Sequence, residues 1–125
     1  MIFAIGHDIV DTDRIKVLLD QYGNTFLKKI LSLEEIIVYQ TKNNNINYLA
    51  KRFAAKEAFA KACGTGLRPP ILLPNISILN DSLGKPEFKF SDDIKNWLLD
   101  KKITSCHLSI SDEKNLASAF VILEL

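Results

Sequence analysis

The chain has 125 residues, of which 47% are hydrophobic and 25% charged, and its net charge is +1. This length suits one domain, and the composition excludes a disordered chain or a collagen-like repeat. No apolar run approaches the roughly 18 residues of a membrane-spanning helix, and the near-neutral charge argues against nucleic-acid binding by bulk electrostatics. A domain this small buries only about two-thirds of its unfolded surface, which leaves little room for a deep cleft.

The first half of the chain is predicted to be one strand followed by helices. Residues 2–10 alternate in the manner of a strand, and Asp11 or Thr12 caps a short helix that ends near Gly23. Neither glycine nor proline occurs between Gly23 and Gly64, so this stretch is predicted to be helical.

Two helices are expected within that stretch. Residues 32–35 form a capping-box sequence that opens a helix with Leu33, Ile36 and Ile37 facing inward. After a loop of asparagines, Asn47 is expected to cap a long helix that runs to about residue 63. Alanines flank the apolar stripe of this helix and let another backbone pack closely against it, which marks it as the central helix; they are Ala50, Ala54, Ala58 and Ala62.

The second half of the chain contains two hairpin patterns. Residues 75–79 and 87–90 flank a turn, Ser91 caps a further helix, and 106–111 and 116–124 are separated by a four-residue turn sequence. The fold class predicted from these elements is α+β: a single domain over residues 1–125 with an antiparallel sheet packed on a long central helix.

Asp8 is a carboxylate inside an apolar strand, on the face that carries small residues. One interpretation is a turn-forming or capping aspartate at the strand end. The other is a hard-metal ligand or an acid/base group, because a desolvated carboxylate must be paired or coordinated.

Glu57 lies along the expected buried stripe of the central helix, and Lys61 follows it by one turn. The two side chains form either an ordinary helix pair or a carboxylate and an ammonium that a metal-bound phosphate bridges. The glycines of 64–66 and the segment 84–86 are turns by the simplest interpretation; close approach of backbone N–H groups to a phosphate is the alternative for 64–66.

Taken together, these segments resemble a known family, the holo-(acyl-carrier-protein) synthases, which are small bacterial phosphopantetheinyl transferases. The resemblance covers nearly the whole chain. It rests on motifs in a fixed order: IGHDIV at 5–10 with Arg14, RFAAKEAFAKA at 52–62 with GTG at 64–66, ND at 80–81 with GKP at 84–86, and SIS at 109–111 before an alanine-rich last strand.

The resemblance implies a phosphopantetheinyl-transferase-like fold and transfer of 4′-phosphopantetheine from coenzyme A to a serine of apo acyl carrier protein, in fatty acid biosynthesis. It implies Mg²⁺ held by Asp8 and Glu57, with Glu57 and Lys61 as catalytic residues. The residues that match coenzyme A contacts are Lys61, Gly64, Thr65, Gly66, Lys85, Pro86 and Ser111.

The resemblance also implies partners and an assembly. An acidic carrier protein is expected to meet basic residues of the first helices, with Arg14 as a contact, and the chain is expected to form a homotrimer with coenzyme A between neighbours. No nucleic-acid or membrane partner is expected. The chain has two cysteines, Cys63 and Cys106, and its N-terminus opens directly into a strand. These features predict a cytoplasmic protein with reduced thiols.

One position departs from the family pattern, which usually has histidine where this chain has Asp112. A histidine there would lie near the nucleotide phosphates, which a carboxylate repels unless a cation intervenes. The favoured interpretation places Asp112 in the hairpin turn, and the alternative adds it to the metal site. A chain that binds coenzyme A or the carrier but is impaired in catalysis is therefore the competing functional hypothesis.

Overall fold

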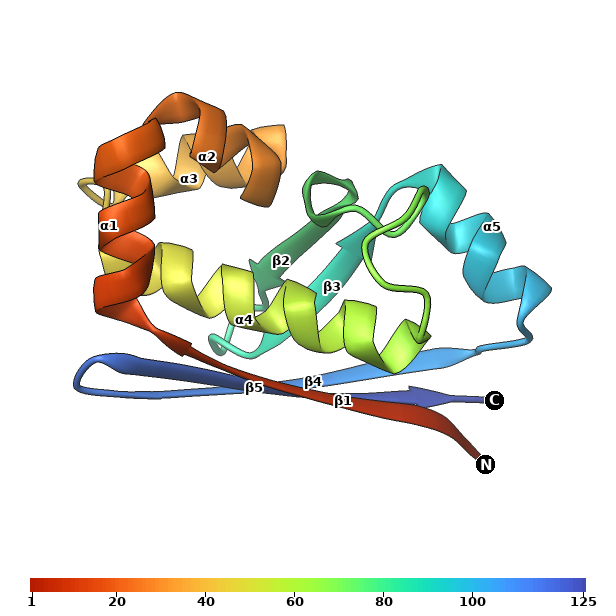
Figure 1. Ribbon diagram of the computed structural model, residues 1–125. Coiled ribbons are helices and arrows are strands. Elements are labelled where there is room, and N and C mark those ends of the chain that lie inside the picture. The colour runs from red at the N-terminus through yellow and green to blue at the C-terminus, as the bar shows by residue number, and fades with distance from the viewer.

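A long helix, α4 (Ile46–Cys63), runs through the middle of the molecule and separates two layers (Figure 1). The structure is a computed structural model and describes residues 1–125. A three-stranded antiparallel sheet covers one side of α4, and the other helices lie on the opposite side with a two-stranded hairpin. No helix has both the length and the apolar character needed to cross a bilayer.

The sheet consists of β1 (Ile2–Asp11), β5 (Leu116–Glu124) and β4 (Ser105–Glu113), in that order, and the hairpin pairs β2 (Ile76–Asn80) with β3 (Pro86–Phe90). The helices of the other layer are α1 (Thr12–Tyr22), α2 (Asn24–Ile30), α3 (Leu33–Thr41) and α5 (Asp92–Asp100). The predicted α+β class, with antiparallel strands and a central helix, is confirmed.

Of the two helices predicted inside the 23–64 stretch, one starts at a different N-cap and the other buries a different face. The N-cap of α4 is Asn45 rather than Asn47, because the Asn45 side chain accepts hydrogen bonds from the backbone N–H groups of Asn47 and Tyr48 at 2.8 and 3.2 Å. In α3 the capping box is present, but Leu33 and Ile37 are 82% and 62% exposed instead of facing inward.

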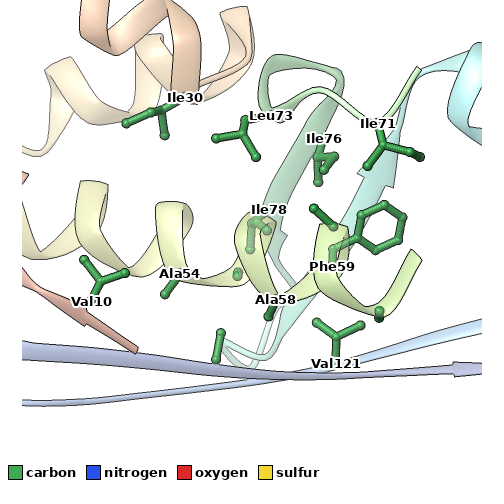
Figure 2. Packing of buried hydrophobic residues seen from close by; sticks show 14 of the residues in the cluster. Val10, Ile30, Ala54, Ala58, Phe59, Ile71, Leu73, Ile76, Ile78 and Val121 are labelled. Atoms are coloured by element: carbon green, nitrogen blue, oxygen red, sulfur yellow. The ribbon is translucent and has the colours of Figure 1, made fainter. Parts of the chain in front are cut away.

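The core lies along α4, between the sheet and the second layer (Figure 2). The predicted alanines face the sheet closely, since Ala54 and Ala58 are fully buried, and Figure 2 shows Ala58 near Val121 of β5. On the opposite side of α4, Ile76 and Ile78 of β2 extend the same cluster. One apolar cluster therefore holds both layers on the central helix.

The closest approach in this core is between β1 and α4 at Gly6. A Cβ atom at this position would lie 1.9 Å from the carbonyl oxygen of Ala58 and 2.8 Å from the backbone nitrogen of Ala62. Both contacts are with backbone, which cannot move aside as a flexible side chain can. Only glycine at position 6 allows the strand and the helix to lie this close.

The other face of the three-stranded sheet is uncovered; β1 and β5 expose apolar side chains on it, whereas β4 exposes polar ones. Side chains alternate along β1, so Gly6 and Val10 face α4 while Ile5 and Ile9 point away from it and are each 58% exposed. Phe120 of β5 joins this outer face. A single chain thus leaves one side of its main sheet without a partner.

We expect Gly6→Ala to lower the free energy of unfolding by at least about 1–3 kcal/mol, the usual penalty for overpacking a core. The added methyl group must push β1 away from α4. Urea denaturation followed by circular dichroism measures the change. A loss below about 0.5 kcal/mol, typical of surface substitutions, would contradict the close packing.

Candidate active site

Asp8 and Glu57 face the same cavity although they are far apart in the sequence. Asp8 lies in β1 opposite Ala119 of β5, on the side of the sheet that faces α4, and Glu57 lies on α4. Both side chains line a cavity of about 500 Å³. The fold therefore brings together the two carboxylates that stood out in the sequence.

Lys61 joins this pair from the next turn of α4. Its Nζ atom donates hydrogen bonds to Asp8 Oδ1 at 2.9 Å and to the carbonyl oxygen of His7 at 3.1 Å. No ion pair connects Lys61 to Glu57, so the ordinary helix pair considered for these residues does not form. The lysine instead bridges the helix to β1.

The electrostatics of the cavity favour a cation. Burial raises the pKa of Glu57, the negative charge of Asp8 raises it further, and Lys61 partly offsets both effects. A site that disfavours a second negative charge gains from a bound divalent ion. Asp8 and Glu57 supply two carboxylates, and Mg²⁺ usually takes one or two protein carboxylates together with phosphates and water; Asp11 also lines the cavity. The donor set therefore fits the ion expected from the sequence.

The walls of the cavity come from α1 and α4. Arg14 lines it with an exposed side chain, and Ile15, Leu18 and Phe53 provide apolar surface. Arg14 thus stands beside the two carboxylates rather than on a distant part of α1.

The other candidate residues do not meet Asp8 and Glu57 within one chain. Gly64 ends α4 in a left-handed conformation with a φ of 74°, and the exposed loop that follows carries Gly66 with a φ of 68°. Lys85 and Pro86 line a different cavity at the start of β3, beside β4. Ser111 lies on the outer face of β4, opposite Ser118.

The interpretation of Asp112 as a turn residue is wrong. Asp112 lies within β4 and pairs with Ala117, and the turn that follows is formed by residues 114 and 115. It also lies outside the cavity of Asp8 and Glu57. It lines a separate cavity of about 850 Å³ that contains the cationic side chains of Lys51 and Arg52. Continued strand pairing overrode the turn preference of the Asp-Glu-Lys-Asn sequence.

The sequence analysis missed a buried ion pair beside this site. Lys56 and Glu35 have fully buried side chains and are bonded to each other. Burial lowers the pKa of Lys56 to about 8, against the opposing effect of Glu35. The sequence contains a signal for the burial of Lys56. Leu49 lies seven residues before it, Phe59 three after it and Cys63 seven after it, so Lys56 belongs to an apolar stripe of the helix.

Comparison with known proteins agrees with this fold. The family model of the 4′-phosphopantetheinyl transferase superfamily matches residues 4–120. The holo-(acyl-carrier-protein) synthase of Nitrosospira multiformis is 52% identical over 124 residues, with 99% of both chains covered. The chain belongs to the 4′-phosphopantetheinyl transferase superfamily, and its full-length relatives are holo-(acyl-carrier-protein) synthases.

Solved structures show the same similarity. The crystal structure of holo-(acyl-carrier-protein) synthase from Neisseria meningitidis superposes with a TM-score of 0.96 at 46% identity, with 100% of both chains covered. The Bacillus anthracis holo-(acyl-carrier-protein) synthase in complex with CoA (3′,5′-ADP) has a TM-score of 0.82 at 36% identity, covering 99% of this chain and 97% of that one.

Proposed function

We propose that this protein transfers 4′-phosphopantetheine from coenzyme A to a serine hydroxyl of apo acyl carrier protein, in fatty acid biosynthesis. The observation that carries the proposal is the convergence of Asp8, Glu57 and Lys61 in a chain whose relatives are holo-(acyl-carrier-protein) synthases. The chain needs no nucleophile of its own, because the attacking oxygen belongs to the carrier.

The transfer breaks the phosphoanhydride bond of coenzyme A and forms a phosphoester bond to the serine. The serine oxygen attacks the phosphorus that bears the pantetheine arm, and the bond from this phosphorus to the bridging oxygen of the pyrophosphate breaks. Adenosine 3′,5′-bisphosphate leaves with the electron pair of that bond. Glu57 receives the serine proton, directly or through a water molecule. The ammonium of Lys61 stabilises the negative charge that develops on the phosphate oxygens.

We assign Asp8 and Glu57 as the ligands of Mg²⁺. Held by these two carboxylates, Mg²⁺ would supply Lewis-acid neutralisation of charge on the pyrophosphate. The raised pKa of Glu57 supports this assignment, because a cation would relieve the unfavourable charge on both carboxylates.

The residues assigned to coenzyme A require a neighbouring chain. Lys61, Gly64, Thr65, Gly66, Lys85, Pro86 and Ser111 remain our candidates for these contacts. They lie on several faces of one chain, and Ser111 lies on the uncovered outer face of the sheet. A homotrimer that covers this face would place outward residues of one chain against the site of the next, with coenzyme A between them.

The carrier protein is proposed to dock on α1 and α2. Arg14 lines the cavity of Asp8 and Glu57, and Lys28 and Lys29 are exposed near the end of α2. Acyl carrier proteins are acidic, so this basic edge complements them. We place the reaction in the cytoplasm, in keeping with the unpaired thiols of Cys63 and Cys106.

The transfer itself is tested by mass spectrometry. Incubation of the protein with coenzyme A, Mg²⁺ and apo carrier should add one phosphopantetheine mass to the carrier, and chelation of the metal should stop the reaction. Asp8→Asn and Glu57→Gln should abolish the mass shift, and Lys61→Met should slow it by about 100-fold. An unmodified carrier that a known synthase does modify, or full activity of both carboxylate variants, would refute the proposal.

The competing hypothesis, a binding module impaired by Asp112, makes a different prediction. It requires that wild-type protein binds coenzyme A in calorimetry without turnover, and that Asp112→His restores turnover. We expect wild-type turnover instead, because Asp8, Glu57 and Lys61 are all present and lie together.

The assembly is tested by light scattering coupled to size-exclusion chromatography. We expect a mass about three times the 14.1 kDa of one chain. Phe120→Asp, on the outer sheet face, should give a folded monomer that no longer transfers phosphopantetheine. Leu99→Asp on α5, where the side chain is also exposed, is the matched control and should leave the trimer intact. A wild-type monomer with full activity would exclude the shared site.

A further inference from the structure

The buried ion pair of Glu35 and Lys56 connects four elements at one point. Lys56 of α4 donates to Glu35 of α3 and, at 2.6 Å, to the carbonyl oxygen of Ile30, the last residue of α2. The carboxylate of Glu35 also accepts from the backbone N–H groups of Ser32 at 3.0 Å and Ile78 of β2 at 2.9 Å. Both side chains are completely buried, so the bonds that join them to each other, to Ile30 and to Ile78 are shielded from water.

This network lies directly behind a second cavity that borders Glu57. The cavity has a volume of about 450 Å³, and Phe26 and Ile30 of α2 line one side of it while Phe53 and Glu57 of α4 line another. Lys56, which holds the carbonyl group of Ile30, immediately precedes Glu57 on α4. The bond between Lys56 and Ile30 therefore ties the end of α2 to the turn of α4 that carries Glu57.

The chemistry of the buried ion pair suits it to fixing the relative position of the helices that it joins. Taking two charges out of water costs as much as their attraction returns, and buried ion pairs are often replaced by apolar residues without loss of stability. An apolar contact, however, lets two helices slide. Directional hydrogen bonds from one ammonium to a carboxylate and to a helix-terminal carbonyl fix both distance and orientation.

We propose that Glu35 and Lys56 are positioning residues that hold α2 at a fixed distance from Glu57, so that a carrier docked on α2 presents its serine within reach of this carboxylate. The proposal rests on the proposed function, because it assigns α2 to the carrier and Glu57 to the reaction. Neither Glu35 nor Lys56 contacts the reacting atoms. Their effect is confined to the carrier side of the reaction and leaves coenzyme A binding unchanged.

The test is the double variant Glu35→Gln/Lys56→Met, which removes both charges together and leaves no uncompensated ion in the core. We expect kcat/KM for the apo carrier to fall by about 10–100-fold, the scale of loss for a displacement of about 1 Å. The dissociation constant of coenzyme A, measured by calorimetry, should stay within about two-fold of wild type. If the ion pair served only to stabilise the fold, the folded variant would keep both kcat/KM for the carrier and the dissociation constant of coenzyme A, or would change both together.

The matched control is Glu34→Gln/Lys89→Met, which removes the neighbouring exposed ion pair between α3 and β3 and should leave both quantities unchanged. Lys56→Arg is the second variant, and it decides the matter if the double variant does not fold. It keeps the charge but has a longer, forked side chain that displaces α2, so it should also lower kcat/KM for the carrier.

Unchanged carrier kinetics in a folded variant, or an equal loss of coenzyme A affinity, would overturn the positioning role. Failure of the wild-type protein to modify the carrier would refute the proposed function instead, so the two failures are distinguishable.

Discussion

The contact between β1 and α4 at Gly6 is the constraint on which the site depends. Gly6 and Asp8 share one face of β1, because side chains alternate along a strand. Ala58 and Ala62, which meet Gly6, are each next to a charged residue, Glu57 or Lys61, on α4. Pressing the strand onto this part of the helix therefore brings Asp8 against Lys61 and into the cavity that Glu57 lines. The absence of a side chain at position 6 permits the close packing, and the same packing places the charged residues together.

Two consecutive residues of α4, Lys56 and Glu57, lie in different electrostatic environments. Lys56 faces a dry interior where its charge is matched by Glu35 and a helix carbonyl. Glu57 is half-buried beside Asp8, and Lys61 pairs with Asp8 rather than with Glu57, so burial and the charge of Asp8 raise the pKa of Glu57. The first environment suits fixed geometry, and the second suits a metal and a phosphate. A helix turns by about 100° per residue, so neighbouring positions can serve these two roles.

The positions at which helices and strands begin and end were predicted from the sequence more reliably than the faces that they bury. Glycine positions, the capping box at Ser32 and the alternation of β1 set the helix and strand order correctly. The inward assignment of Leu33 and Ile37 was wrong, because α3 buries Glu35 and Tyr39 instead. Local periodicity treats a glutamate as a solvent-facing residue, and only the distant Lys56 and the N–H group of Ile78 make its burial favourable.

The candidate site was predicted from the sequence only in part. Asp8 and Glu57 stood out because each interrupts an apolar pattern, and the fold brings them together. The ion pair of Lys61 with Asp8 was not predicted, because spacing along the helix indicates only Glu57 as a neighbour of Lys61. Asp112 was misplaced because its strand continues through a sequence that favours a turn. Pairing with β5 decides such positions, and it depends on register across the sheet rather than on local residue type.

The size of the chain explains why the remaining candidates are dispersed. Its core is occupied by α4 and the two layers on it, so the charged centre is confined to one shallow cavity at the edge of β1. Residues proposed to contact coenzyme A, such as Ser111, lie on the face of the sheet turned away from this cavity. The β1 and β5 part of the same face is uncovered and exposes Ile5, Ile9 and Phe120. Burying this surface between copies of the chain would stabilise an assembly and enclose a large co-substrate at once, which one 125-residue chain cannot do by itself.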